Sequence, residues 1–113
     1  MRDDRQRLVD IIEATRLLQA FQANRKRDDL AQDPLLRSAL LHQLFVIGEA
    51  ATRLSQSLKD RYSAIPWRAI CAFRNFIAHE YFSLDPDVVW QTVTVDAPLL
   101  QAQIEEILAR ENP

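Results

Sequence analysis

The segment from Arg74 to Tyr81 brings an arginine, a histidine and a tyrosine together at the end of an apolar, helix-like stretch. A histidine imidazole can move the proton of an RNA 2′-hydroxyl or of the leaving oxygen, and an arginine guanidinium can stabilise a pentavalent phosphorane. Arg74 and His79 are therefore the candidate catalytic residues for cleavage of a phosphodiester bond without a metal ion. Such a pair would support a modest nuclease rather than a fast one.

A purely structural interpretation of the same segment stays open. An arginine at the edge of a helix often pairs with a carboxylate, and a histidine near a helix C-terminus often interacts only with the last carbonyl groups. Tyr81 fits a half-buried aromatic residue that packs with Phe82 below the next connection. Glu80 is expected to lie at the surface at the end of the helix, and Cys71 is expected to fill space as a small apolar side chain.

The composition excludes several other kinds of site. One glycine and one cysteine among 113 residues rule out the Gly-rich phosphate loops and an internal disulfide. Cys71, His42 and His79 lack the spacing of a zinc site, so we expect neither a metal nor a cofactor. The formal net charge of −2 provides no global attraction to nucleic acid, so any RNA contact must be local.

A length of 113 residues, with 48% hydrophobic and 27% charged residues, favours a single folded domain over residues 1–113. The charged start is followed by mixed apolar and polar positions. We therefore expect neither a signal peptide nor a membrane span. Together with the single cysteine, this favours a cytoplasmic location.

The spacing of apolar residues predicts two helices in the first half of the chain, over about residues 3–22 and 34–58. Asp33 is the expected N-cap of the second helix, with Pro34 at its first position. Residues 24–33 carry charges of both signs, for which a solvated connection is favoured over a basic contact with RNA.

Two further helices are expected in the second half, over about residues 66–79 and from Asp85 onward. Trp67 should anchor the entry of the third helix, and Pro98 should kink the fourth. No stretch shows the alternation of a strand. The expected fold is therefore all-α, an antiparallel four-helix bundle.

The second helix is apolar on nearly every side. Besides its main apolar stripe, it carries a second flank formed by Leu41, Phe45 and Gly48. Too little protein is left to cover this flank, so we expect a homodimer that is built partly on this helix. Glu49 and Arg53 have the spacing of an ion pair on the remaining polar wedge.

At about 100° per residue, His79 shares a helical stripe with Arg68, Ala72 and Asn75, opposite the apolar ridge. Arg74 lies about 140° from His79 on the same count, so the two side chains do not meet within one ideal helix. They could converge if the helix unwinds, if the arginine wraps round, or if a second copy supplies the partner across a two-fold axis. We expect dimerisation to give the site its shape.

The string from Arg74 to Tyr81 resembles the Arg-x4-His-x-Tyr motif of the HepT-like toxins, a branch of the HEPN superfamily. Four other short segments are similar to the family pattern: Ile47–Ala50, Ile65–Trp67, Val89–Trp90 and Pro98–Leu99. The resemblance covers roughly residues 5–110 and includes the order of these segments along a four-helix chain.

The resemblance implies a homodimeric, metal-independent endoribonuclease toxin in which Arg74 and His79 of both subunits line one cleft. Asn75 would help to orient the pair. It also implies a partner, an MntA-like minimal nucleotidyltransferase antitoxin of a type VII toxin–antitoxin system, which transfers AMP from ATP to Tyr81. In this light Gly48 indicates the close approach of a facing helix, with a tolerated helix glycine as the alternative, and Glu49 becomes a candidate contact of Arg74.

Two other functions stay open at this point. The chain could be a non-catalytic helical subunit that docks a minimal nucleotidyltransferase and presents Tyr81 or another substrate to it. The net acidic charge and the lack of a strong basic patch favour this alternative. It could also be a purely structural dimerisation domain in which Arg74 forms an ion pair and His79 caps a helix.

Overall fold

The computed structural model describes residues 3–111, which contain helices and no β-strand. The all-α expectation is confirmed. No helix in this range is both long enough and apolar enough to cross a bilayer. In chain order the elements are α1 (Asp4–Gln22), α2 (Asp29–Gln32), α3 (Pro34–Arg53), α4 (Gln56–Arg61), α5 (Trp67–His79), the 3-10 turn η1 (Tyr81–Ser83), α6 (Pro86–Gln91), the π-helical turn η2 (Thr92–Asp96) and α7 (Ala97–Glu111).

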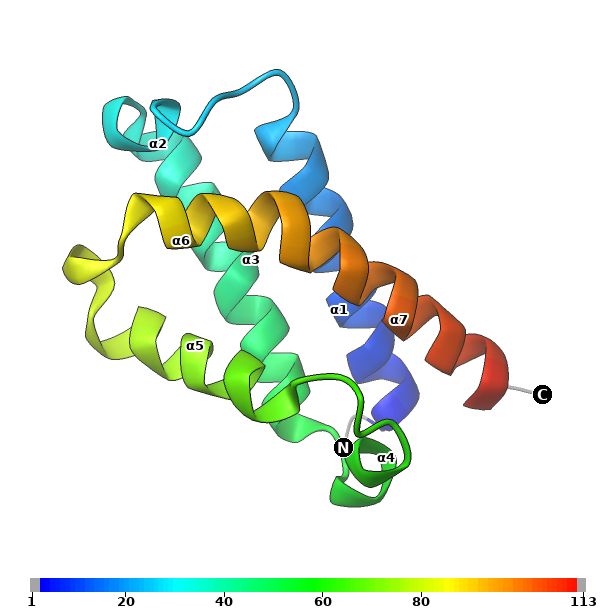
Figure 1. Ribbon diagram of the computed structural model, residues 1–113. Helices are drawn as coiled ribbons and strands as arrows, with labels where there is room; N and C mark the ends of the chain where they lie inside the picture. The colour runs from blue at the N-terminus through cyan, green and yellow to red at the C-terminus, as the bar shows by residue number, and fades with distance from the viewer. Residues whose placement is uncertain (1–2, 112–113) are drawn as a thin grey trace.

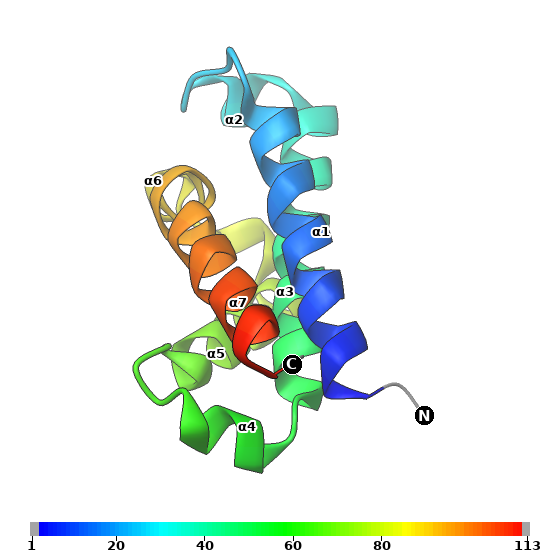
Figure 2. The ribbon, with the colours of Figure 1, turned by 90° about the vertical axis from the view of Figure 1, so that its right-hand side faces the viewer.

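The longest helix, α3, lies at the centre of the molecule, with α1 packed on one side and α5 on another (Figures 1 and 2). The segments α6, η2 and α7 form one continuous C-terminal arm, Pro86–Glu111, which packs on α1. The start of α1 and the end of α7 lie at the same end of the molecule, next to the short helix α4.

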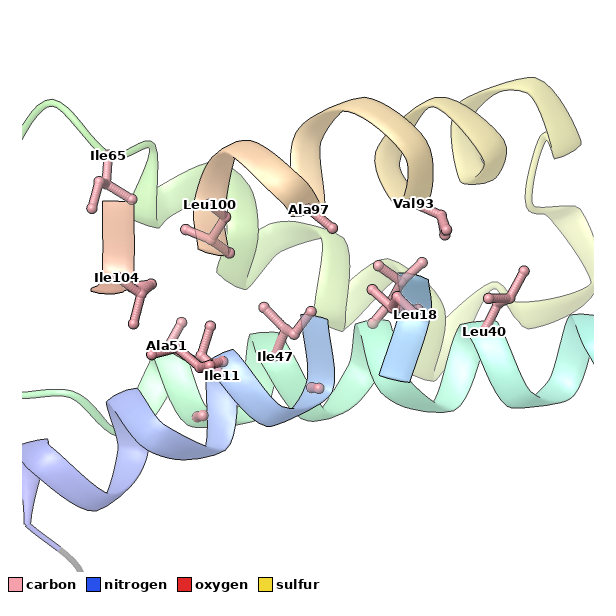
Figure 3. Packing of buried hydrophobic residues seen from close by; sticks show 14 of the residues in the cluster. Ile11, Leu18, Leu40, Ile47, Ala51, Ile65, Val93, Ala97, Leu100 and Ile104 are labelled. Atoms are coloured by element: carbon pink, nitrogen blue, oxygen red, sulfur yellow. The ribbon is translucent and has the colours of Figure 1, made fainter. Parts of the chain in front are cut away.

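One apolar core joins α1, α3 and the C-terminal arm. Figure 3 shows Ile11 and Leu18 of α1 near Leu40, Ile47 and Ala51 of α3. The arm adds Val93, Ala97, Leu100 and Ile104 to the same layer, and all of these residues are buried. Burying one such large aliphatic side chain contributes about 1.5–3 kcal/mol, so this core fixes the position of α3.

The second apolar flank of α3 is covered within one chain. Leu41 and Gly48 are buried and Phe45 is half-buried. The premise that too little of the chain is left to cover this flank is therefore wrong, and the homodimer stays a prediction. The large apolar side chains that stay exposed lie elsewhere and include Phe76 of α5, Val95 of η2 and Leu99 of α7.

The second expected helix is divided in two. It ends at Arg53 instead of continuing to about Leu58, and α4 follows after a break. At the break the Ser55 hydroxyl accepts a hydrogen bond from the Leu58 amide, while the Ser55 amide and hydroxyl both donate to the Asp4 carboxylate. A serine with these partners begins a new helix because its bonds compete with the continuing helical ladder.

The charged connection over residues 24–33 contains the short helix α2, whose Leu30 is buried. Both of its arginines are paired with carboxylates: Arg25 lies 3.0 Å from Asp33, and Arg27 lies 2.8 Å from Asp87. The segment therefore resembles a solvated surface connection with neutralised charge more than a free basic contact.

Pro98 stands near the start of α7, directly after η2. The Ala97 amide donates to the Thr92 carbonyl five residues back, which widens the helix just before the proline. Because proline has no amide hydrogen and crowds the preceding turn, a widened turn relieves the conflict. The irregularity that we expected in the helix at Pro98 is thus a π-helical turn directly before the proline.

Candidate active site

Helix α5 carries the candidate residues and is anchored at both ends. Trp67 at its start is buried, and its indole Nε1 donates to the Tyr62 carbonyl at 3.1 Å. Ile77 near its end is also buried. This confirms the expected role of Trp67 at the entry of the helix. The two anchors fix the rotation of α5 about its axis and so decide which residues face α3.

Arg74 faces α3 and is enclosed by four residues, Phe45, Gly48 and Glu49 of α3 and Asn75 of α5, which we call the arginine cradle. Oε1 of Glu49 accepts hydrogen bonds from Nε of Arg74, at 3.0 Å, and from Nη2. Nη1 of Arg74 donates to Oδ1 of Asn75 at 2.6 Å. The guanidinium carbon lies 5.6 Å from the ring centroid of Phe45, in cation–π range.

Gly48 allows the two helices to approach this closely. A Cβ atom added to Gly48 would overlap the Cβ of Arg74 and would lie 2.9 Å from its Cγ. The interpretation of Gly48 as a close-approach point is therefore confirmed, and the facing helix is α5 of the same chain. Residues 45, 48 and 49 share one face of α3 because helical neighbours lie three and four positions apart.

The charges of the cradle are coupled. Hydrogen bonds from Arg74 lower the pKa of the Glu49 carboxyl, and the positive charges of Arg74 and Arg53 add to this effect against the opposing effect of burial. Nη2 of Arg53 lies 3.7 Å from Oε2 of Glu49, so the expected ion pair within α3 is present but longer than the contact with Arg74. Glu49 is thus an ionised partner of Arg74 at neutral pH.

His79 is the last residue of α5, and its side chain is exposed. The imidazole forms no hydrogen bond or ion pair with another residue of the range 3–111. Arg74 points toward α3, about 140° round the helix from His79. Within one chain the structure therefore does not bring the two candidate catalytic residues together, and Asn75 contacts only the arginine of the two.

Tyr81 lies just beyond α5 in η1, where it is half-buried and packs edge-to-face on Phe82 with ring centroids 5.2 Å apart. It lines a cavity of about 340 Å³ together with Leu30, Arg37 and Val89. Its hydroxyl has no hydrogen-bond partner within residues 3–111 and is not among the buried unpaired polar atoms. The phenol oxygen therefore meets solvent.

Sequence reasoning found Arg74, Asn75, His79 and Tyr81 but missed Phe45 as a platform for the guanidinium. The spacing of Phe45, Gly48 and Glu49 was the available signal, because it places an aromatic, a gap and a carboxylate on one helical face. Of the described residues, no group of three or more His, Cys, Asp or Glu could hold a metal ion.

Comparison with known proteins identifies the class to which this helical protein belongs. Residues 11–107 match the family described as Ribonuclease HepT-like. The chain therefore belongs to the HepT-like ribonuclease family of the HEPN superfamily, as the motif indicates. No solved structure gives a significant match.

Individual relatives agree with this assignment. The chain is 34% identical over 85 residues, 75% of this chain and 76% of the relative, to a protein of Caldanaerobacter subterraneus subsp. tengcongensis that is named provisionally as an RNase. It is 33% identical over 100 residues, 88% of this chain and 91% of the relative, to the "Probable ribonuclease HepT" of Thermococcus cleftensis. A Methanocaldococcus jannaschii protein, also named provisionally as an RNase, is 26% identical over 104 residues, 92% of this chain and 95% of the relative.

Proposed function

We propose that this protein is a metal-independent endoribonuclease toxin of a type VII toxin–antitoxin system, with Arg74 and His79 as its catalytic residues. One observation carries the proposal: the helix that ends in the exposed His79 also holds Arg74 in the arginine cradle. A guanidinium fixed before the substrate arrives can stabilise a transition state without reorganisation. Membership of the HepT-like ribonuclease family supports RNA as the substrate.

The proposed reaction is an attack of an RNA 2′-oxygen on the adjacent phosphorus. The bond from phosphorus to the 5′-oxygen breaks, which leaves a 2′,3′-cyclic phosphate. His79 takes the proton of the 2′-hydroxyl while water protonates the leaving 5′-oxygen, or the two exchange these roles, and Arg74 stabilises the phosphorane. A positioned acid or base contributes about 10²–10⁴ in rate, and one preorganised charge about 2.7–4 kcal/mol.

The separation of Arg74 and His79 within one chain motivates the homodimer. We propose that the four longest helical segments form a HEPN-type four-helix bundle and that two copies meet along α5, so that each supplies residues to one cleft. A groove of about 300 Å³ between α5 and the C-terminal arm supports this, since it is lined mainly by apolar residues that include Ile70, Phe73 and Leu99. Leu99 is 61% exposed, so a partner would bury apolar surface here.

The charge of α5 fits an RNA substrate better than the net charge of the chain does. Helix α5 contains Arg68, Arg74 and His79 and no carboxylate. Arg68 also lines a surface depression of about 550 Å³ together with Lys59 and Asp60. Basic side chains such as Arg68 and Lys59 can attract a phosphate backbone locally although the whole protein is weakly acidic.

The test is RNA cleavage by the purified protein in the presence of EDTA. We expect the wild type to cut RNA and His79→Ala to lose about 10²–10⁴ in rate. His42→Ala is the matched control, because His42 is the other histidine and is exposed on α3. Equal cleavage by His79→Ala and wild type would refute the catalytic assignment, and an inactive wild type would refute the proposed reaction.

Tyr81 is the proposed acceptor of AMP from an MntA-like nucleotidyltransferase. Its phenol oxygen would attack the α-phosphorus of ATP, and pyrophosphate would leave as the bond to the β-phosphate breaks. The chain has two tyrosines, and the other, Tyr62, already donates its hydroxyl hydrogen to Glu111 at 2.7 Å. The added phosphate would bring negative charge and bulk next to α5, where RNA is proposed to bind.

Co-expression with the neighbouring nucleotidyltransferase, followed by mass spectrometry, tests this modification. Added AMP units should appear on the wild type and on Tyr62→Phe but not on Tyr81→Phe. The reverse pattern, or modification of both variants, would exclude Tyr81 as the sole acceptor.

The alternative function is a non-catalytic subunit that docks the nucleotidyltransferase. The nearly complete exposure of Phe82, 99%, directly beside Tyr81 favours a docking surface at this point. Expression of the chain alone separates the two functions. A toxin arrests growth in the absence of its partner, whereas a docking subunit does not.

A further inference from the structure

We infer that Glu49 is a positioning residue that presents one defined edge of the Arg74 guanidinium to the RNA phosphate. This inference rests on the proposed nuclease function, because it assigns the orientation of the group that stabilises the phosphorane. It adds a residue outside the Arg-x4-His-x-Tyr motif to the proposed site, and that residue comes from a different helix, α3.

The argument begins with the hydrogens of the guanidinium. An arginine side chain has five N–H hydrogens. Glu49 Oε1 accepts from Nε and from the Nη2 hydrogen on the same side, and Asn75 accepts from Nη1. One hydrogen on each terminal nitrogen is left without a partner within residues 3–111. Guanidinium groups bind phosphate through paired N–H groups of this kind.

The single oxygen of Glu49 also fixes the plane of the guanidinium. It bridges Nε and Nη2, so rotation about the last side-chain bonds of Arg74 would break two hydrogen bonds at once. Phe45 supports one face of the same group, and Gly48 lets the arginine stem lie directly on α3. A long side chain that is 26% exposed thus loses its freedom before any substrate binds.

Two simpler roles for Glu49 give opposite expectations. If Glu49 only repelled RNA, its neutralisation would raise both binding and cleavage, because one negative charge would be removed from the site. If it only stabilised the fold, its neutralisation would lower the melting temperature and leave the kcat of the folded protein unchanged. A positioning role lowers kcat at unchanged or tighter RNA binding, since orientation matters most in the transition state.

The experiment compares Glu49→Gln and Glu49→Asp with Glu111→Gln in single-turnover RNA cleavage. Glu111→Gln is the matched control, because it weakens another Arg–Glu pair at 2.6 Å, away from α5. We expect Glu49→Gln to lose about 10- to 100-fold in kcat with KM unchanged or lower. Glu49→Asp should lose activity too, because its carboxylate is shorter by one methylene. Glu111→Gln should keep the activity of the wild type.

A second measurement reports the orientation without relying on catalysis. The Nε–H resonance of Arg74, assigned in NMR spectra with Arg74→Lys, should show restricted side-chain motion in the wild type and free motion in Glu49→Gln. Unchanged kcat in a folded Glu49→Gln protein, or equal Arg74 mobility in both proteins, overturns the inference. If the wild type proves inactive, the proposed function fails, while the NMR comparison still decides whether Glu49 positions Arg74.

Discussion

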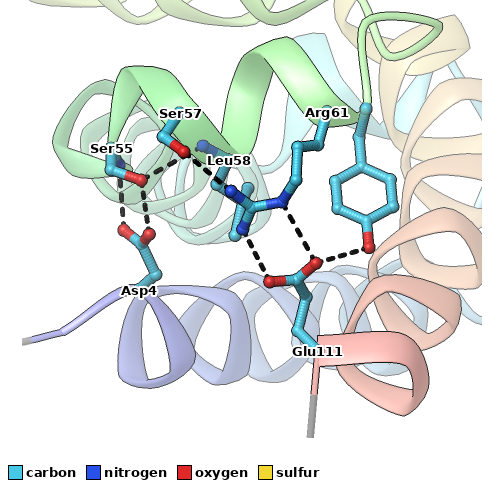
Figure 4. A network of polar contacts seen from close by, with 7 residues as sticks. Asp4, Ser55, Ser57, Leu58, Arg61 and Glu111 are labelled. Carbon is cyan, nitrogen blue, oxygen red and sulfur yellow. Dashed lines mark hydrogen bonds and ion pairs between the residues drawn. The ribbon is translucent and has the colours of Figure 1, made fainter.

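Two Arg–Glu ion pairs in different parts of the molecule have different surroundings, and the comparison shows which features of an ion pair point to a functional site. At the arginine cradle, Arg74 of α5 meets Glu49 of α3. At the end of the molecule where α1 begins and α7 ends, Arg61 of α4 meets Glu111 of α7 (Figure 4). We call the second group the terminal clamp; it consists of Asp4, Ser55, Ser57, Arg61, Tyr62 and Glu111.

In the terminal clamp it is the carboxylate that is fully used. Nε and Nη2 of Arg61 donate to the two oxygens of Glu111 at 3.3 and 2.6 Å, and Nη1 donates to the Ser57 hydroxyl at 2.7 Å. Tyr62 supplies a further hydrogen to the same carboxylate. Both oxygens of Glu111 are thus engaged, and the bonds join segments about 50 residues apart. This geometry ties the helices together.

The arginine cradle differs in how its carboxylate is used. Oε1 of Glu49 takes two N–H groups of Arg74, and Oε2 has only the longer contact with Arg53 at 3.7 Å. The cradle also lies on the helix that ends in an exposed histidine, whereas the clamp has no such neighbour among its members. Both arginines use three N–H groups, so an ion pair alone indicates nothing about function. The histidine at the end of the same helix is what makes Arg74 a candidate.

The largest contrast is expected from replacing each arginine by lysine. Arg74→Lys keeps the positive charge but cannot hold Glu49 and a phosphate in the paired geometry of a guanidinium. We expect a loss of about 10²–10³ in RNA cleavage. Arg61→Lys should cleave at the rate of the wild type. Equal activity of Arg74→Lys would mean that only charge matters at this position and would remove the distinction between the two pairs.

Gly48→Ala should lower the stability of the folded protein, because the added methyl group would push Arg74 out of the arginine cradle. An exposed Gly→Ala change in a helix stabilises by about 1 kcal/mol, yet the new Cβ would overlap Arg74. We expect a net loss of about 1–3 kcal/mol in the free energy of unfolding, measured by urea denaturation. In an Arg74→Gly background the overlap is removed, so Gly48→Ala should be neutral or stabilising there. The same loss in both backgrounds would place the strain elsewhere.

The helix ends show which parts of the fold could be predicted from the sequence. The caps at Asp33–Pro34 and Asp85–Pro86 were predictable because their bonds are local: Asp33 accepts from Leu35 and Leu36, and Asp85 accepts from Asp87. The break at Ser55 was not, because its partner Asp4 lies 51 residues away. The length of a helix depends here on a tertiary contact that no local pattern contains.

In the candidate site, too, the local features could be predicted and the distant contacts could not. The types and spacing of Arg74, His79 and Tyr81 were visible in the sequence, and so was their separation around one helix. The partner of Arg74 was only a guess, since Glu49 is 25 residues away and has Arg53 as a local competitor. The apolar flank of α3 was expected to be uncovered, but α5 and its arginine pack on Gly48 within the chain, a tertiary contact that the local pattern does not contain.

Acid should weaken both pairs. The pKa values of Glu49 and Glu111 are lowered in the folded state, in each case mainly by hydrogen bonds from the paired arginine. A carboxyl with a lowered pKa stabilises the fold above its unfolded value of about 4.3, and this contribution is lost as the pH falls through the folded value. Unfolding free energies of the wild type, Glu49→Gln and Glu111→Gln should therefore converge as the pH falls below the unfolded value and through the folded one. A constant difference between wild type and either variant over that range would contradict this.

Strong base should weaken only the terminal clamp, and this is the smallest effect that we expect. The hydrogen bond to Glu111 raises the pKa of the Tyr62 phenol. A phenol with a raised pKa stabilises the fold below its unfolded value of about 10, and the contribution is lost as the pH rises through the folded value. Tyr62→Phe should lower the melting temperature slightly at neutral pH, and its difference from the wild type should vanish in strong base. Glu49→Gln should show no such alkaline change, because no tyrosine hydroxyl donates to Glu49 within residues 3–111.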